Sequence, residues 1–389
     1  MESKSKESNP IGIVNRLGSV FASSRRSLHY YHVVVSLVLL LATIVRLFLF
    51  YSVPDIMKSD ETLYGHMAYY ALYGSGFGFW MERSYFYPMI LLSVIVFSHP
   101  GLTHVWDPYL LIVTRGFNLA MNVLCVLLTF FIGRTIGGTN VGLLASFLLS
   151  ICWLDAFWGF RAVSEVPATL FLLISLLFTA RGLILDSRKR FFLAGLFLGF
   201  SFMVRFQSVL LFVPVAVLLS QRRTHLRYAL SGLVLAILIQ GLVDLVSWGS
   251  FLSSPWNFLV LNILSGGSAR WGIRPLLYYF ERIPGIVGWN VILFAVLTLF
   301  SLNSHTSFFW MIVATHVTVF SLVAHKERRF LIPILPVFFL LAALGFVQFE
   351  KRLQRPEYRI LLSLLLLLPE LFLSLDTISA IVAREFLVP

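Results

Sequence analysis

The chain has 389 residues, of which 58% are hydrophobic and 12% are charged, and its formal net charge at pH 7 is +12. Soluble domains carry about a quarter charged residues, so this composition excludes an ordinary soluble protein and predicts an integral membrane protein. The basic residues lie between apolar runs, which indicates the charge bias of membrane loops and not a nucleic-acid partner.

The first apolar run follows 32 polar and basic residues, which we expect to form a cytoplasmic segment. This run, VVVSLVLLLATIVRLFLFYSV, is too long for the core of a signal peptide and lacks a small-residue cleavage site. It therefore predicts a transmembrane helix, and with the later runs it predicts eleven spans. The predicted spans are residues 33–53, 109–132, 141–156, 166–181, 191–204, 206–220, 229–248, 287–303, 307–324, 330–348 and 360–376.

These spans predict a single all-α integral membrane domain over residues 1–389, without a linker or a clear internal repeat. With the N-terminus inside, every basic cluster falls on the cytoplasmic side, in agreement with the positive-inside rule. Two long loops, residues 54–108 and 249–286, then lie outside. The short apolar stretch at 85–97 predicts an interfacial or re-entrant helix in the first loop. The basic clusters are Arg25–Arg26, Arg188–Arg190, Arg222–Arg227 and Lys351–Arg359.

Two adjacent acids, Asp60 and Glu61, follow the first predicted span. Charge is costly at membrane depth and often marks a function. One interpretation is an interfacial pair that caps a helix. The other is that one acid is a general base whose pKa is raised by burial and by its like-charged neighbour. Glu82 and Arg83 then precede the aromatic segment YFYPMI, which a membrane-interface belt would also explain.

The second long loop carries arginines among aromatic residues, including Arg270, Trp271 and Arg274. Arginine on the outer side opposes the inside-positive bias, which predicts an anionic target. A guanidinium can bind a phosphate through two N–H groups, and aromatic rings offer flat faces to sugars or isoprenoid chains. Anionic lipid headgroups are the alternative target.

The segment HKERRFLIP at 325–333 places five ionisable residues between two apolar spans, which predicts a ligand site or an ion-pair network. Arg161 and Glu165 are four residues apart and predict a helical salt bridge. Asp244 is expected to pair with an arginine or to bind backbone at the entrance of the second loop. Three arginines inside apolar runs need partners or an aqueous cavity: Arg46, Arg115 and Arg205.

The sequence predicts neither a metal site nor a disulfide. Its nine histidines lack the spacing of a zinc site, and Cys125 and Cys152 lie inside apolar runs. The glycines of GSGFGF at 74–79 follow no strand, so they do not predict a phosphate-binding loop. We expect no cofactor.

In their order, these motifs resemble the GT-C glycosyltransferases, and most closely the mannosyltransferases that use dolichyl-phosphate mannose to extend N-glycan precursors and glycosylphosphatidylinositol anchors. The first loop of that family carries H-P-D-E, aromatic residues, Y-G and R-S-Y-x-Y-P. Here KSDETLYGHMAYYALYG and RSYFYPMI follow that order, with Lys58 and Ser59 in place of histidine and proline. In the second loop NFLVLN and WGIRPLL match, with Arg274 where histidine is usual. The most specific match, H-K-E-x-R-F-x-x-P-x-x-P, is HKERRFLIPILP.

The resemblance implies a GT-C fold of about eleven transmembrane helices, with amphipathic helices in the first outer loop, and Asp60 as catalytic base. Glu61 would orient Asp60 or the acceptor, and four cations would bind the donor phosphate: Arg274, His325, Lys326 and Arg329. A further set would bind substrate or be structural: Arg83, Arg161, Glu165, Arg205, Asp244, Arg270 and Trp271.

The implied function is inverting transfer of a sugar, mannose, from a polyprenyl (dolichyl) phosphate to a hydroxyl of a lipid-linked glycan or glycolipid. The reaction would occur on the non-cytosolic face of an endoplasmic reticulum or prokaryotic plasma membrane, with membrane lipids as surroundings and no nucleic acid. A polytopic transporter or lipid flippase is the alternative, because it would also show many spans and intramembrane arginines. A catalytically silent binding subunit is a third interpretation.

Overall fold

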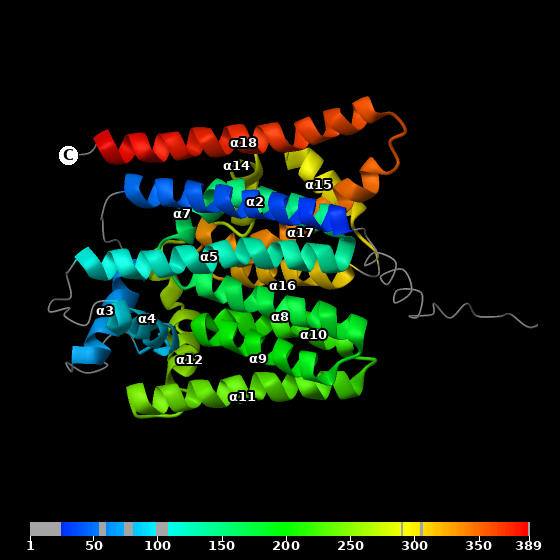
Figure 1. The fold of residues 1–389 in the computed structure, drawn as a ribbon. Helices are drawn as coiled ribbons and strands as arrows, with labels where there is room; N and C mark the ends of the chain where they lie inside the picture. The colour runs from blue at the N-terminus through cyan, green and yellow to red at the C-terminus, as the bar shows by residue number, and fades with distance from the viewer. Residues whose placement is uncertain are drawn as a thin grey trace, which may run out of the picture.

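The computed structural model describes residues 25–53, 60–73, 81–98, 108–288, 291–303 and 306–387. Lys58, Ser59, the glycines at 74–79 and most of the predicted N-terminal segment lie outside these residues. Across the described ranges the chain is helical or irregular and contains no strand. The long helices lie side by side in one bundle (Figure 1). The predicted all-α fold is confirmed.

Six helices in the described ranges are long and apolar enough to cross a membrane, or up to eight if each of two bent pairs is one span. The prediction of eleven spans is not confirmed by this criterion, because several predicted spans form shorter helices. These six correspond to α2 (Arg25–Ser52), α5 (Pro108–Gly137), α8 (Glu165–Leu185), α11 (Arg223–Trp248), α17 (Leu335–Glu350) and α18 (Pro356–Leu387). Other predicted spans form shorter helices, among them α9 (Arg188–Val204), α10 (Phe212–Leu219), α15 (Val291–Phe300) and α16 (Ser307–Leu322).

The predicted span 141–156 is broken. It forms α6 (Thr139–Ile151) and α7 (Trp153–Gly159), which meet at an angle of 66°. Cys152 between them has extended backbone, with φ −62° and ψ 114°. Apolar composition alone cannot reveal this break, because Ile151, Cys152, Trp153 and Leu154 continue the apolar run through it.

The first outer loop contains two helices, α3 (Asp60–Tyr73) and α4 (Phe86–Ser98), at one end of the bundle (Figure 1). The helix predicted at 85–97 is therefore present. Its 13 residues would extend about 20 Å, which is shorter than the hydrocarbon core of a bilayer. The starts of α2 and α11 lie at the other end of the bundle, where the basic clusters gather.

The second long loop begins at Gly249, whose left-handed backbone (φ 75°) ends α11. It then forms five short helical pieces, which bring the loop across the end of the bundle. These are α12 (Ser253–Phe258), a π-helical turn η2 (Leu259–Leu264), a 3-10 turn η3 (Gly267–Trp271), α13 (Tyr278–Arg282) and α14 (Pro284–Val287).

Glycines allow α9 and α11 to pack backbone against backbone. A Cβ added to Gly195 would lie 1.8 Å from the carbonyl oxygen of Ala229, and one added to Gly232 would lie 2.0 Å from that of Phe192. Small residues serve this purpose at membrane helix interfaces, where close packing replaces the hydrophobic effect.

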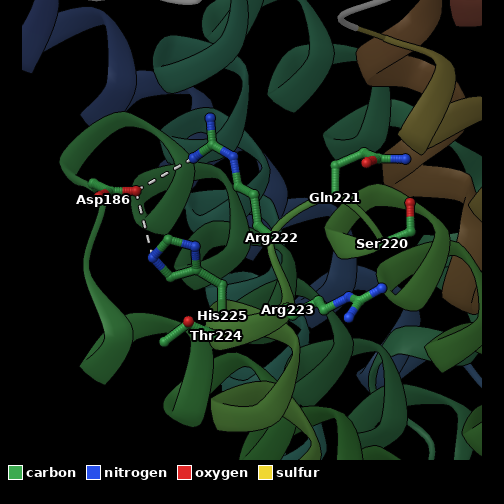
Figure 2. Close-up of a pocket in the computed structure, with 7 residues that line it drawn as sticks. All are labelled: Asp186, Ser220, Gln221, Arg222, Arg223, Thr224 and His225. Atoms are coloured by element: carbon green, nitrogen blue, oxygen red, sulfur yellow. Dashed lines mark hydrogen bonds and ion pairs between the residues drawn. The ribbon is translucent and has the colours of Figure 1, made fainter.

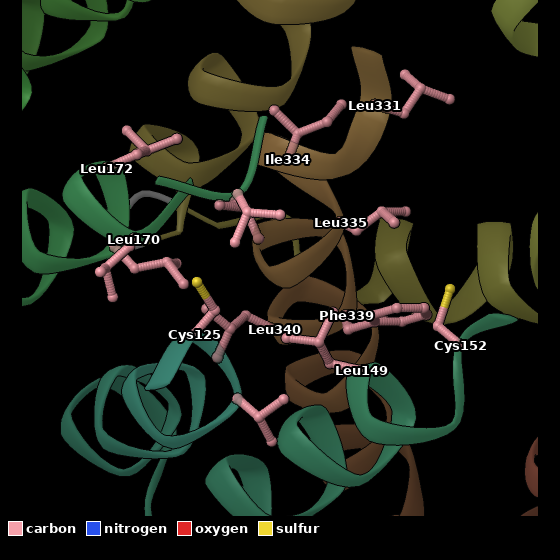
Figure 3. Packing of buried hydrophobic residues seen from close by; sticks show 14 of the residues in the cluster. Cys125, Leu149, Cys152, Leu170, Leu172, Leu331, Ile334, Leu335, Phe339 and Leu340 are labelled. Carbon is pink, nitrogen blue, oxygen red and sulfur yellow. The ribbon is translucent and has the colours of Figure 1, made fainter. Parts of the chain in front are cut away.

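The helix α17 forms the centre of the bundle. Its span is 89% buried, and its side chains Leu335, Phe339 and Leu340 lie among those of α5, α6 and α8 (Figure 3). Cys125 and Cys152 lie in this core as separate free thiols. A 3-10 turn, η4 (Arg328–Ile334), leads into α17, so the charged segment at 325–329 is fixed to the most buried element of the fold.

Candidate active site

Each of the three arginines inside apolar runs has an acidic partner. Arg46 on α2 pairs with Asp155 on α7 at 2.5 Å, and both side chains are fully buried. Arg46 also donates a hydrogen bond to the side-chain oxygen of Asn122 on α5. The requirement for partners that the sequence predicted is therefore met at this site, which links α2, α5 and α7.

Glu61 lies outside the cavity described below. Its Oε1 accepts a hydrogen bond from Nε of Arg115 at 2.7 Å, and its Oε2 accepts one from Nη2 at 3.1 Å. The backbone N–H of Ala162 also donates to Oε1, at 3.3 Å. Glu61 is 2% exposed. Because Arg115 belongs to α5, its bonds with Glu61 join α3 to α5. The catalytic role of Glu61 stays a prediction.

A cavity of about 920 Å³ is lined by α3, the second outer loop and the segment before α17. This volume lies within the range of small-molecule sites. Six of the residues predicted from the sequence line it: Asp60, Arg83, Arg205, Trp271, His325 and Arg329. The remaining lining residues are Thr62, Leu63, His66, Met67, Tyr70, Trp158, Gln207, Phe258, Asn262, Ile263, Ser268, Phe320, Val323, Glu327 and Phe330.

Asp60 is the first residue of α3 and lies between two arginines. Nη2 of Arg83 donates to Oδ1 of Asp60 at 3.2 Å, and Nη2 of Arg329 lies 2.9 Å from Oδ2. The Asp60 side chain is 17% exposed, so part of it remains accessible from the cavity. Asp60 and the 325–329 segment therefore share one pocket, as the sequence predicted.

Arg329 connects this acid to two others. Its Nε lies 2.7 Å from Oε2 of Glu327 and 3.6 Å from Oε1 of Glu165. Glu165, which is fully buried, also pairs with Arg205 at 2.5 Å. The predicted ion-pair network at 325–329 is thus present and extends to α8. The buried Nη1 of Arg329 has no hydrogen-bond partner among the described residues.

The expectation of a raised pKa for Asp60 is wrong. Burial raises the pKa of this carboxyl, but Arg83, Arg329 and Arg205 together outweigh burial and hold the pKa below its ordinary value. Glu61, the like-charged neighbour in sequence, pairs instead with Arg115. The pKa of Glu327 is also lowered. Burial raises this pKa, but Arg329 and His325 together outweigh burial.

Lys326 and Arg274, two predicted phosphate ligands, lie outside the cavity lining and form hydrogen bonds with backbone groups. The ammonium of Lys326 donates to the carbonyl oxygens of Arg274 at 3.0 Å and Val323 at 2.7 Å. The backbone N–H of Arg274 donates to Ala324 at 3.1 Å, while its side chain is exposed. These bonds fix the second loop to the segment before η4. Binding of phosphate by Lys326 or Arg274 stays a prediction.

The predicted salt bridge between Arg161 and Glu165 is wrong. Arg161 lies in the turn before α8 and not within the helix, so the four-residue spacing does not bring the two side chains together. The guanidinium of Arg161 instead lies 4.5 Å from the ring centroid of Phe157. Glu165 forms its ion pairs with Arg205 and Arg329.

Asp244 fulfils the second of its two expected roles. Its Oδ2 accepts the backbone N–H of Ser254 at 2.9 Å, at the start of the second loop, and its Oδ1 accepts from Gln240 at 2.8 Å. Arg270 is exposed and lies outside the cavity lining. Both residues therefore stay candidates for structural or binding roles.

A second pocket, of about 560 Å³, lies at the opposite end of the bundle, between the turns that follow α8 and α10. Figure 2 shows Asp186 held by Arg222 at 3.3 Å and by His225 at 3.4 Å. Asp186 is largely exposed, and three of the six other lining residues are basic, which is typical of a cytoplasmic turn.

Sequence reasoning missed several cavity residues. Thr62, His66 and Tyr70 on α3 and Gln207 on η1 (Phe206–Leu211) carry no charge in the motif and gave no signal by residue type. The helical spacing of residues 63, 66, 67 and 70 after Asp60 could have identified the α3 residues. In the described ranges, no three His, Cys, Asp or Glu side chains are close enough to hold a metal ion.

Solved structures with a similar fold include two GT-C enzymes. ArnT from Cupriavidus metallidurans in the apo state gives a TM-score of 0.64 at 12% identity, over 92% of this chain and 78% of that chain. The archaeal oligosaccharyltransferase AglB from Archaeoglobus fulgidus gives 0.61 at 12% identity, over 92% and 56%. The helices and their arrangement thus define a membrane protein with the GT-C fold.

The chain belongs to the Alg9-like mannosyltransferase family, whose sequence model matches residues 30–386. It is 33% identical over 128 residues to the GPI alpha-1,2-mannosyltransferase 3 of Danio rerio, covering 33% of this chain and 23% of that protein. It is 31% identical over 180 residues to the alpha-1,2-mannosyltransferase algn-9 of Caenorhabditis elegans, covering 39% and 30%. The alignments thus span a third or less of these two relatives.

Proposed function

We propose that this protein is an inverting glycosyltransferase that moves a sugar, mannose, from a polyprenyl phosphate to a hydroxyl of a glycolipid or lipid-linked glycan. The observation that carries the proposal is the position of Asp60 between Arg83 and Arg329 in the cavity. The site therefore combines a proton acceptor with cations, which are the two groups that this reaction needs.

The reaction needs a single displacement step. The acceptor hydroxyl gives its proton to Asp60 while its oxygen attacks the anomeric carbon of the donor sugar. The bond from that carbon to the phosphate oxygen breaks, and its electron pair leaves with the phosphate. Because the phosphate leaves as an anion, no general acid is required. A single direct displacement inverts the anomeric carbon, by the logic of inverting glycosidases.

The cations are suited to the phosphate of the donor. Arg329 has a buried Nη1 without a hydrogen-bond partner in the described part of the chain, and buried donors are normally paired. A phosphate oxygen would supply that partner and gain a charge-assisted bond. ArnT has been solved with undecaprenyl phosphate and AglB with a dolichol phosphate, so the fold accommodates lipids of this class.

The location of the cavity suggests the non-cytosolic side of the membrane. The site lies at the end of the bundle that carries α3 and α4, and the basic turns lie at the other end (Figure 1). Basic loops prefer the cytoplasm, so the reaction would occur on the other side. The membrane of a eukaryotic cell would then be the endoplasmic reticulum, where the lipid donor can approach from within the bilayer.

Incubation of the purified protein with radiolabelled polyprenyl-phosphate mannose and candidate glycolipids tests this function. We expect a labelled glycolipid product, and Asp60→Asn should lower turnover by about 10²-fold or more, because the base is lost. Asp186→Asn is the matched control, since it removes an equivalent acid at the opposite end of the bundle. Movement of the lipid across vesicles without covalent change would favour the transporter. Wild-type turnover in Asp60→Asn would remove Asp60 from the mechanism.

A further inference from the structure

One face of α3 continues the cavity wall beyond Asp60. Leu63, His66, Met67 and Tyr70 recur with the spacing of a single helical face, and all four line the cavity together with Thr62. At 1.5 Å per residue, His66 and Tyr70 lie about 9 Å and about 15 Å along the helix axis from Asp60. The face is therefore long enough to contact both the sugar at Asp60 and its neighbour in a glycan.

The charges of the cavity are unevenly distributed. The arginines that line it, Arg83, Arg205 and Arg329, all belong to other segments, and each is paired with an acid. Beyond Asp60, the cavity face of α3 presents a hydroxyl, an imidazole and a phenol. Burial lowers the pKa of His66, so this imidazole is uncharged at neutral pH and acts as a neutral hydrogen-bonding group.

The second outer loop adds groups of the same character. Asn262 contributes an amide and Trp271 an indole to the lining. The Thr62 hydroxyl is buried and has no hydrogen-bond partner in the described part of the chain, so a ligand hydroxyl can satisfy it. Neutral hydrogen-bonding groups together with aromatic rings suit an uncharged sugar and not a phosphate.

We propose that Thr62, His66 and Tyr70 on α3 form the acceptor subsite, which takes an uncharged sugar residue and presents one of its hydroxyls to Asp60. This inference rests on the proposed function, because it divides the same cavity into two parts. The arginines serve the anionic donor, and α3 serves the neutral acceptor. The two ligands can then bind at the same time without competition.

A binding experiment tests the subsite without relying on catalysis. The protein is placed in lipid nanodiscs, because alkyl-glycoside detergents would themselves occupy a sugar site. Tryptophan fluorescence, to which Trp158 and Trp271 in the lining contribute, is then followed during titration with methyl α-mannoside or with its 6-phosphate. Both titrations are repeated with saturating farnesyl phosphate, which stands in for the lipid phosphate.

We expect methyl α-mannoside to bind with an affinity that farnesyl phosphate leaves unchanged within about twofold. The affinity for the 6-phosphate should fall by about tenfold or more when farnesyl phosphate occupies the arginines. His66→Ala and Tyr70→Ala should each weaken methyl α-mannoside by about tenfold while farnesyl phosphate binds as before. Tyr51→Ala is the control, since it removes a tyrosine that is 81% exposed on α2.

Competition between methyl α-mannoside and farnesyl phosphate would overturn the subsite, as would unchanged mannoside binding in both α3 variants. Kinetics separate this failure from that of the proposed function. If the wild type transfers mannose, the α3 variants should raise the acceptor KM about tenfold and the donor KM less than twofold. A donor KM that rises in parallel would assign α3 to the donor. Absence of transfer in the wild type would count against the enzyme, while the binding results would still judge the subsite.

Discussion

Arg329 lies 2.9 Å from Asp60, although the two residues belong to opposite halves of the chain. The same guanidinium also contacts Glu327 and lies near Glu165, so one cation meets three acids from three segments. A donor phosphate at Arg329 would compete with Asp60 for this positive charge. Donor binding would then weaken the ion pair that holds Asp60 and make its carboxylate a stronger base.

The pH dependence of the reaction should show this effect. Arg83, Arg329 and Arg205 hold the pKa of Asp60 below its ordinary value, against the effect of burial, so Asp60 is ionised in the free enzyme above about pH 4. As pH falls, kcat/KM should therefore decline only below about pH 4, whereas kcat, which reports the bound complex, should decline at higher pH. Steady-state rates from pH 3.5 to 8 measure both.

The variant Arg83→Gln provides the control for this assignment. Removal of one cation should raise the pKa of Asp60 and move the acid limb of kcat/KM toward neutral pH. A limb that stays in place in Arg83→Gln, or a wild-type limb near pH 6, would show that another group governs the rate.

Arg329→Ala should chiefly impair use of the donor. Loss of a charge-assisted contact predicts a rise of about tenfold or more in the apparent KM for polyprenyl-phosphate mannose. Arg329→Lys keeps the charge but loses the planar fork, so its effect should fall between the wild type and Arg329→Ala. Unchanged donor affinity in both variants would remove Arg329 from the phosphate site.

Glu61→Ala should lower stability more than chemistry. It leaves Arg115 buried without its carboxylate, which costs about 3–5 kcal/mol for a buried pair. We expect a lower melting temperature, while the kcat of the protein that remains folded falls far less than in Asp60→Asn. A loss of kcat equal to that of Asp60→Asn, without a change in melting temperature, would restore Glu61 to a catalytic role.

The pair Arg46 and Asp155 should behave as a coupled unit. Asp155→Leu leaves a buried guanidinium and should destabilise the protein by about 3–5 kcal/mol. Arg46→Met combined with Asp155→Leu removes both charges and should be more stable than either single variant. Thermal unfolding in one detergent measures this cycle, and additive effects of the two substitutions would contradict the coupling.

Gly232→Val should disrupt the contact between α9 and α11. Even a Cβ at this position would lie 2.0 Å from the carbonyl oxygen of Phe192, so the two helices must separate. The variant should aggregate or unfold at lower temperature. Gly116→Val on α5 is the control, because a Cβ there meets nothing within 4 Å. Equal stability of the two variants would show that the helices do not depend on this close approach.

The sequence was sufficient for the class of fold and for the central juxtaposition of Asp60 with the 325–329 segment. Apolar runs predict helices because backbone groups in a bilayer must bond within the helix, and the ordered motifs identified the residues that meet. It could not show the break at Cys152, which leaves the apolar pattern unchanged. It also could not assign partners among several acids and arginines, so Glu165 was matched with Arg161 and not with Arg205.

The prediction of a raised pKa for Asp60 was wrong for a related reason. Adjacency along the chain suggested repulsion by Glu61, but successive residues on a helix point in different directions. Glu61 reaches Arg115, while Asp60 reaches two arginines from distant segments. Titration depends on neighbours in space, which the sequence leaves open.

The position of Arg329 has a consequence for biosynthesis. The segment that completes the site is synthesised after α3 and α8, since η4 and α17 follow both in the chain. A nascent protein therefore holds Asp60 and Glu165 before Arg329, which lies near both acids, has been made. The centre becomes competent only when α17 packs against α5 and α6, which are already there, so chains that stop before η4 should be inactive.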